Sequence, residues 1–122
     1  MNVIQIMDNF NVGGGVNSFV YDLCYALKSN GCSVCLIGIL VDGFDNNPEI
    51  MELRKSDIQV VCLGAKSKAD AVFNYKNRLR KLLKEVSGNE ITICNLHLKL
   101  SVLMGIVATM GLRNIKCIET YH

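Results

Sequence analysis

Features that would exclude a compact domain are scarce in this sequence. It holds one proline, no long block of like charge, no low-complexity tract and no internal repeat, so a disordered chain is excluded. Half of its 122 residues are hydrophobic and 20% are charged, so there are enough apolar side chains for a hydrophobic core. Length and composition therefore predict one globular domain.

Long apolar runs are missing as well. The first ten residues lack a basic leader and carry only a short apolar run, which is not the pattern of a signal peptide. The most apolar stretch, residues 100–112, has 13 residues, whereas a membrane-spanning helix needs about 20. We therefore expect a buried helix in this stretch and a cytoplasmic protein.

The six cysteines show neither the spacing of a zinc site nor the context of a disulfide framework. They lie at positions 24, 32, 35, 62, 94 and 117. Cys32 and Cys35 form one CxxC pair, but no second pair lies at a suitable spacing, and residues three apart on a strand face opposite sides. In a reducing cytosol we expect buried, inert thiols that pack as small hydrophobic groups, and no metal site.

Strand-like and helix-like segments alternate along the chain. Strands are expected at residues 3–7, 33–41, 58–63, 91–96 and 115–121, and helices at 16–30, 47–56, 69–86 and 98–110. The second helix opens with the capping Asn47, followed by Pro48. This order predicts the α/β class: a Rossmann-like, doubly wound parallel sheet with helices on both faces. Because the chain stops as the fifth strand ends, we expect a truncated domain from a longer protein.

Apolar spacing predicts which helix faces point inward. In the first helix the inward residues are expected to be Val16, Phe19, Val20, Leu23 and Leu27. In the helix at 69–86 they are expected to be Val72, Tyr75, Leu79, Leu82 and Val86. The helix at 98–110 is apolar nearly all round, which predicts a central, buried position.

Polar residues follow the carboxyl ends of the expected strands, where open α/β sheets bind their ligands. In chain order these residues are Asp8, Asn9, Asn11, Asp42, Lys66, Asn95, His97, Thr120, Tyr121 and His122. Both histidines of the chain therefore fall at one edge of the sheet. Each could be an ordinary solvated or satisfied polar side chain, and a shared role in ligand binding is an equal alternative.

Three consecutive glycines, Gly13, Gly14 and Gly15, precede the first expected helix. Glycines let a ligand approach the backbone closely, and the amides at a helix N-terminus favour phosphate or carboxylate. The alternative is a flexible turn into the helix, which needs fewer glycines. The loop departs from the dinucleotide fingerprint because residues 8–12 separate it from the strand, and no Gly-Lys-Ser/Thr follows as in a P-loop.

The ordered set of segments resembles the opening of family-four retaining glycosyltransferases. Those enzymes begin with a strand, a loop with paired glycines, a helix carrying Asp-Leu and Ala-Leu, and then a glycine. The matching residues here are Gly13–Gly15, Asp22, Leu23, Ala26, Leu27 and Gly31, with Cys32 in place of the usual histidine. Further along, an apolar strand that ends in polar residues and His97 is followed by an apolar helix, which is similar to the family's order. The closing residues 118–122 resemble the family's next apolar strand, which often ends in Thr-x-His. The resemblance spans essentially the whole chain.

The resemblance implies a two-domain GT-B enzyme. Residues 1–122 would be its Rossmann-like N-terminal, acceptor-side domain, and the C-terminal donor-binding domain would be absent. The implied reaction moves a hexose from a nucleotide-diphosphate-sugar donor to a glycan or lipid-linked acceptor, as in polysaccharide biosynthesis, without a cofactor or metal. The resemblance makes His122 catalytic and assigns binding of the donor diphosphate or substrate to Gly13, Gly14, Gly15, Asn95 and His97. The fragment alone is not expected to catalyse transfer.

Residues 66–84 hold seven basic residues and one acid, Asp70. Lys76, Arg80 and Lys84 lie four residues apart, so they form one stripe opposite the expected apolar face. A solvated helix face explains this stripe most simply. Peripheral contact with an anionic membrane is the alternative, which would suit a lipid-linked acceptor at the inner face of the membrane. Nucleic acid is not expected, because no reading motif accompanies the basic residues.

Two further functions stay open at this point. One is a non-catalytic nucleotide- or phosphate-binding α/β module, and the other is a relic without activity. A donor-binding domain downstream of residue 122 would favour the glycosyltransferase over both.

Overall fold

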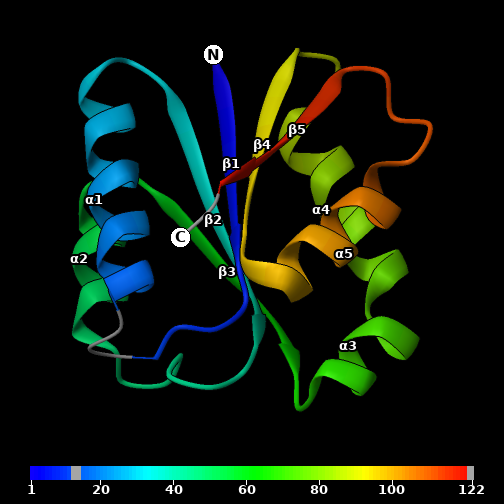
Figure 1. Cartoon of the computed structure of the whole chain (residues 1–122). Helices are drawn as coiled ribbons and strands as arrows, with labels where there is room; N and C mark the ends of the chain where they lie inside the picture. The colour runs from blue at the N-terminus through cyan, green and yellow to red at the C-terminus, as the bar shows by residue number, and fades with distance from the viewer. Residues whose placement is uncertain (12–14, 121–122) are drawn as a thin grey trace.

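The computed structural model describes residues 1–11 and 15–120, which form five strands and five helices (Figure 1). The strands are β1 (Asn2–Met7), β2 (Ser33–Leu40), β3 (Gln59–Ala65), β4 (Thr92–His97) and β5 (Ile115–Thr120). The helices are α1 (Gly15–Ser29), α2 (Pro48–Lys55), α3 (Lys68–Asn74), α4 (Lys76–Ser87) and α5 (Leu98–Thr109). Each expected strand is present, with ends that differ by one or two residues.

The five strands form one parallel sheet in the order β3-β2-β1-β4-β5. Helices α1 and α2 cover one face, and α3, α4 and α5 cover the other (Figure 1). The chain therefore winds outward from β1 through β2 to β3, and then from β4 to β5 in the opposite direction. This confirms the doubly wound α/β fold and places a topological switch point between β1 and β4, where such sheets bind ligands at their carboxyl ends.

Each face of the sheet carries its own hydrophobic core. On the face covered by α3, α4 and α5, the buried residues include Ile4, Ile6, Ile37, Leu79, Leu83 and Met104. On the face covered by α1 and α2, they include Met7, Phe10, Val20, Leu36, Leu53 and Ile58. Ile6 and Met7 are neighbours in sequence but belong to different cores, because successive side chains of a strand point to opposite faces.

The long helix expected at 69–86 is two helices, which corrects the sequence-based prediction. Tyr75 separates α3 from α4 with backbone angles φ −118° and ψ −1°. Its hydroxyl lies 3.4 Å from the carbonyl oxygen of Gly64, so the side chain is held against the end of β3 while the chain changes direction. The break changes the buried face: Val72 is 36% exposed, and Ala71, Leu79, Leu83 and Ser87 are buried.

The expectation of a central helix at 98–110 is also wrong. Helix α5 buries Leu100, Met104 and Ala108 against the sheet and α4. Its outer side remains apolar but exposed, with Leu103 at 51%, Ile106 at 52% and Met110 at 66%. Apolar composition on all sides therefore did not predict burial on all sides.

The apolar stripe expected on α1 is only partly buried. Val20 lies in the core together with Tyr21 and Cys24, whereas Phe19 is 47% exposed. Leu23 and Leu27 instead line a groove of about 240 Å³ on the same face of the sheet, beside Ile93 and Ile118 of β4 and β5. One part of the stripe therefore lies in the core and another part lines the groove. The reason is that α1 packs beside the β4–β5 half of the sheet and does not cover it. Among the described residues, no helix combines the length and apolarity needed to cross a membrane.

Candidate functional site at the carboxyl edge

His97 is the last residue of β4, and its side chain is fully buried at the switch point. Its Nε2 lies 2.6 Å from Oε1 of Gln5 on β1, which is 1% exposed. Because a carbonyl oxygen only accepts hydrogen bonds, Nε2 of His97 carries the proton in this contact. The ring of Phe19 on α1 meets the imidazole edge-on, with 6.4 Å between ring centroids. The imidazole is therefore held by two elements as well as by its own strand.

A second polar pair lies beside the first. Thr120 on β5 donates a hydrogen bond from Oγ1 to Oδ1 of Asn95 on β4, at 2.5 Å. In the strand register Asn95 is the partner of Gln5, and Thr120 is the partner of His97. Partner residues of adjacent strands point to the same face of a sheet, so all four side chains lie on the α1 side. Three neighbouring strands thus present one amide–imidazole pair and one amide–hydroxyl pair at their carboxyl ends.

The N-terminus of α5 is occupied by a carboxylate of the protein itself. Oδ1 of Asp8, which follows β1, accepts hydrogen bonds from the amide of Ser101 at 2.8 Å and from its hydroxyl at 2.6 Å. Both residues are buried. Because the carboxylate satisfies this end of the helix dipole, α5 does not offer an anion site to a ligand.

Helix α1 begins at Gly15. Its first turn contains no acidic residue, and an added Cβ at Gly15 would meet no atom within 4 Å. Amides at the start of a helix favour an anion when no protein group occupies them. Gly15, which is exposed, therefore stands at an accessible and electropositive helix end.

Residues 9–11, which follow β1, are anchored to the protein interior. Asn17 of α1 donates from Nδ2 to the carbonyl oxygen of Asn11 at 2.5 Å, and Asn11 donates its amide to Oδ1 of Asn9 at 3.1 Å. Phe10 is fully buried, and its ring fills the space that a side chain at Gly38 would need. Asn47 holds the carbonyl oxygen of Phe10 with a hydrogen bond of 3.0 Å.

The residues assigned to the site from the sequence thus have different outcomes. Asn95 and His97 lie together on β4, and Gly15 begins α1. Gly13, Gly14 and His122 lie outside the described residues. Sequence reasoning missed Gln5, because a glutamine inside an apolar strand was not considered as a partner for a histidine 92 residues away. The sequence analysis also named Asp8 as a polar residue of this edge but did not identify Ser101 as its hydrogen-bond partner.

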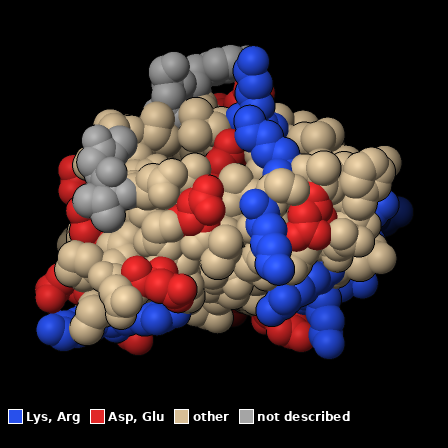
Figure 2. Space-filling view, turned by 90° about the horizontal axis from the view of Figure 1, so that it is seen from below, with Lys and Arg blue, Asp and Glu red and all other residues tan. Residues whose placement is uncertain are grey.

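Basic and acidic side chains both lie along this edge of the sheet. Figure 2 looks onto the edge and shows a row of Lys and Arg side chains across it, with Asp and Glu side chains on both sides of the row. Lys66 and Lys68 follow β3, Lys99 follows β4, and all three are exposed. Among the described side chains, no group of three His, Cys, Asp or Glu is placed to hold a metal ion.

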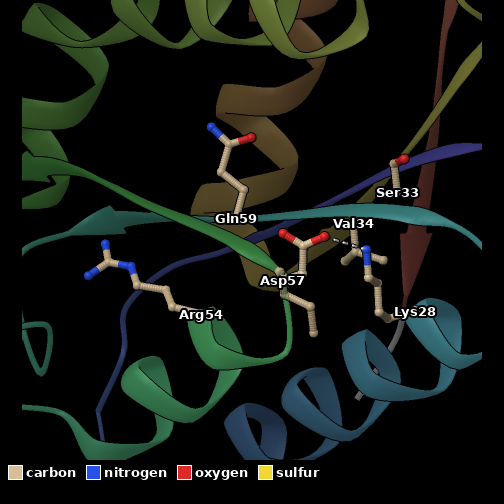
Figure 3. Close-up of a pocket in the computed structure, with 7 residues that line it drawn as sticks. Lys28, Ser33, Val34, Arg54, Asp57 and Gln59 are labelled. Atoms are coloured by element: carbon tan, nitrogen blue, oxygen red, sulfur yellow. Dashed lines mark hydrogen bonds and ion pairs between the residues drawn. The ribbon is translucent and has the colours of Figure 1, made fainter.

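A pocket of about 310 Å³ at the opposite, amino edge is a weaker candidate (Figure 3). Both cations that line it are engaged: Nζ of Lys28 lies 3.3 Å from Oδ2 of Asp57, and Nη2 of Arg54 donates to the carbonyl oxygen of Val60 at 2.9 Å. The amino edge of a parallel sheet is also not where such folds bind ligands. The carboxyl edge therefore remains the candidate site.

A scan against models of known protein families finds no match to this chain, and a search of curated proteins finds no match either. The fold and the edge define a doubly wound α/β protein with polar side chains at its β1–β4 switch point.

Proposed function

We propose that this chain is the acceptor-side, Rossmann-like domain of a two-domain glycosyltransferase of the retaining GT-B type. The enzyme would move a sugar from a nucleotide-diphosphate-sugar to a glycan or lipid-linked acceptor, with no cofactor. The observation that carries the proposal is the exposed start of α1 at Gly15, whose first turn has no acidic residue, together with the polar pairs of β1, β4 and β5 at the carboxyl edge of the sheet. These features meet at the switch point.

The start of α1 supplies the electrostatic part of the proposed chemistry. The diphosphate of the donor gains charge as it leaves, and fixed amides aimed at it lower the barrier without reorganising. The nearby α5 cannot share this task, since Asp8 occupies its first turn. Asn17 of α1 holds the carbonyl oxygen of Asn11, and Phe10 is buried, so the start of α1 is tied to the segment that follows β1.

The polar pairs supply orientation. Asn95 and Thr120 are partly exposed and line the groove beside α1, so their amide and hydroxyl groups can hydrogen-bond sugar hydroxyls. His97 is buried and acts on this surface by fixing Gln5. The catalytic role of His122 rests on the family resemblance alone.

Binding of inorganic pyrophosphate to this chain tests the anion site, with amide shifts followed by NMR. The account expects saturable shifts at Gly15, Val16 and Asn17. The variant Gly15→Asp places a carboxylate in the first turn of α1, where it favours the helix but repels the ligand. It should therefore keep the fold and lose the shifts. Shifts at Lys28 and Arg54, or equal binding by the variant, would contradict the assignment.

The alternative is a non-catalytic phosphate- or nucleotide-binding module, which would use the same helix end. Sugar transfer by the natural gene product separates the two, and so does its intact mass. A glycosyltransferase of this type needs a donor-binding domain in addition to residues 1–122, whereas a binding module does not.

Contact with an anionic membrane also stays part of the proposal, but of the basic stripe only Lys76 and Lys84 remain candidates for it. Nη1 of Arg80 donates to the carbonyl oxygens of Ala108 and Met110, at 3.1 Å and 2.5 Å, so this side chain caps α5. Lys76 and Lys84 are exposed. An apolar pocket of about 370 Å³ next to Phe73, which is 83% exposed, is bordered by Lys68 and Lys99.

Vesicle sedimentation tests this contact. The account expects binding to phosphatidylglycerol vesicles at low salt and none to phosphatidylcholine vesicles. Phe73→Ser should weaken the binding, whereas Met51→Ser, at an exposed position of α2, should not. Equal binding to both lipids would contradict electrostatic recognition.

A further inference from the structure

Cys94 and Cys117 are partners in the register of the parallel strands β4 and β5. Adjacent strands lie about 4.8 Å apart, and disulfides join residues whose Cα atoms are about 4.4–6.8 Å apart. Register partners point to the same face, so both thiols lie on the side of the sheet that α5 covers. The backbone therefore already satisfies the main geometric requirement for a bond between the two sulfurs.

The two thiols differ in access. Cys94 is fully buried in the core beneath α5, whereas Cys117 is exposed. Sγ of Cys117 also lies 3.2 Å from Oγ1 of Thr109. Contact with the Cys94 thiol lowers the pKa of Cys117 to about 6, while the contact with Cys117 and burial raise the pKa of Cys94 above its usual range. An exposed thiol thus lies beside a buried thiol.

We propose that Cys94 and Cys117 form a thiol-modification site that reacts with small disulfides of the oxidised-glutathione class. The Cys117 thiolate attacks one sulfur of the reagent, forms a mixed disulfide and releases one glutathione thiolate. The Cys94 thiol then loses its proton to solvent or to that thiolate and attacks the Cys117 sulfur. A Cys94–Cys117 disulfide forms and a second glutathione leaves, so one disulfide is reduced as another is made.

The other cysteines do not share this arrangement. Burial raises the pKa of Cys24 and of Cys35 to about 12, so neither supplies a thiolate at neutral pH. Cys35 packs in the core on the α3–α5 face, whereas Cys32 packs against the core on the α1–α2 face. The CxxC pair is therefore divided between opposite faces of the sheet, as its spacing predicts. The expectation of buried thiols is wrong at Cys117, which is exposed.

The site lies next to the polar edge. Asn95 follows Cys94 on β4, and its partner Thr120 lies three residues beyond Cys117 on β5. A disulfide would link the two strands directly beside the Asn95–Thr120 hydrogen bond. Oxidation would thus cross-link β4 and β5, the same two strands that carry the candidate ligand contacts Asn95 and Thr120.

Native protein treated with oxidised glutathione at neutral pH, then analysed by intact mass and peptide mapping, tests the proposal. The wild type should lose the mass of two hydrogens and yield a Cys94–Cys117 peptide pair. Cys94→Ala should stop at a glutathione adduct on Cys117, and Cys117→Ser should form neither product. Cys32→Ser is the matched control and should behave as the wild type.

Three results would overturn the proposal: a stable glutathione adduct on wild-type Cys117, no reaction at Cys117, or a disulfide that maps to Cys32 and Cys35. Because Cys94 is buried, circular dichroism should first show that Cys94→Ala is folded. If Cys94→Ala is not folded, the comparison of the wild type with Cys117→Ser still tests the proposal, because the side chain changed in Cys117→Ser is exposed.

Discussion

Nε2 of His97 lies 2.6 Å from Oε1 of Gln5, and this contact joins β4 to β1 where the winding of the sheet reverses. Both side chains are buried, so neither can exchange this partner for bulk water. A polar pair in such a place must be satisfied internally or weaken the fold. It therefore fixes the geometry at the point where the ligand is proposed to bind.

Replacing Gln5 by leucine should lower the free energy of unfolding by about 1–3 kcal/mol, because it leaves a buried imidazole N–H without this acceptor. Gln59 is exposed at the start of β3, so Gln59→Leu is the matched control and should have little effect. Urea unfolding measures both. Equal stability of Gln5→Leu and the wild type would show that the contact has no structural weight.

The Asp8–Ser101 contact should show energetic coupling. Asp8→Ala leaves the Ser101 amide and hydroxyl without their buried acceptor, so it should cost about 1–3 kcal/mol. Ser101→Ala removes only the hydroxyl and should cost less. A double-mutant cycle should give a coupling of at least about 0.5 kcal/mol. Asp45→Ala, at an exposed position, is the control, and additive effects of the pair would contradict the account.

Two glycines should respond oppositely to alanine. A Cβ at Gly38 would lie within 2.8 Å of three atoms of the Phe10 ring, so Gly38→Ala should destabilise the fold by about 1–3 kcal/mol. Gly15→Ala meets no atom within 4 Å and should be neutral or stabilising by up to about 1 kcal/mol. Thermal unfolding gives both values. A loss of stability in Gly15→Ala would mean that this glycine is needed by the fold.

Alanine substitutions of Arg80 and Lys84 should differ in their effect on stability, although both residues belong to the predicted basic stripe. Arg80→Ala leaves the carbonyls of Ala108 and Met110 without their donor and should cost about 1–2 kcal/mol. Lys84 is exposed, so Lys84→Ala should change stability by no more than about 0.5 kcal/mol. Chemical denaturation compares them, and equal effects would argue against the cap.

Cysteine alkylation should depend on pH in a defined way. Because the pKa of Cys117 is lowered to about 6, its reaction with iodoacetamide should rise through that pH and level off above it, as the thiolate fraction saturates. The pKa of Cys24 and that of Cys35 are raised to about 12, so both should stay protected at neutral pH. Labelling followed by peptide mass measures each site. A rise centred near the ordinary thiol pKa would contradict the proposed activation.

Local sequence patterns predicted much of the fold for physical reasons. Alternating strand and helix periods predicted the doubly wound sheet, and the Asn47-Pro48 pair predicted the start of α2. The structure confirms that start, because Oδ1 of Asn47 accepts the amide hydrogen of Glu49 at 3.0 Å. These signals lie within a few residues of the features they determine.

Features that depend on distant partners were not predicted. Tyr75 divides a periodic segment because its hydroxyl reaches the Gly64 carbonyl, and no local pattern contains that contact. Phe19 has core spacing but lies outside the core, because the position of α1 on the sheet decides which side is covered. Position along the chain predicted that Asn95 and His97 lie at the carboxyl edge, whereas the pairing of Asp8 with Ser101 required the fold.

The most direct test of the central claim is release of nucleoside diphosphate from a set of nucleotide-sugars by the full-length natural gene product. Wild type and His122→Ala should be compared in the presence of membrane and glycan acceptors. The account predicts release with a subset of donors by the wild type and loss of that release in the folded variant. Release at equal rates by both proteins, or none with any nucleotide-sugar, would contradict the glycosyltransferase proposal.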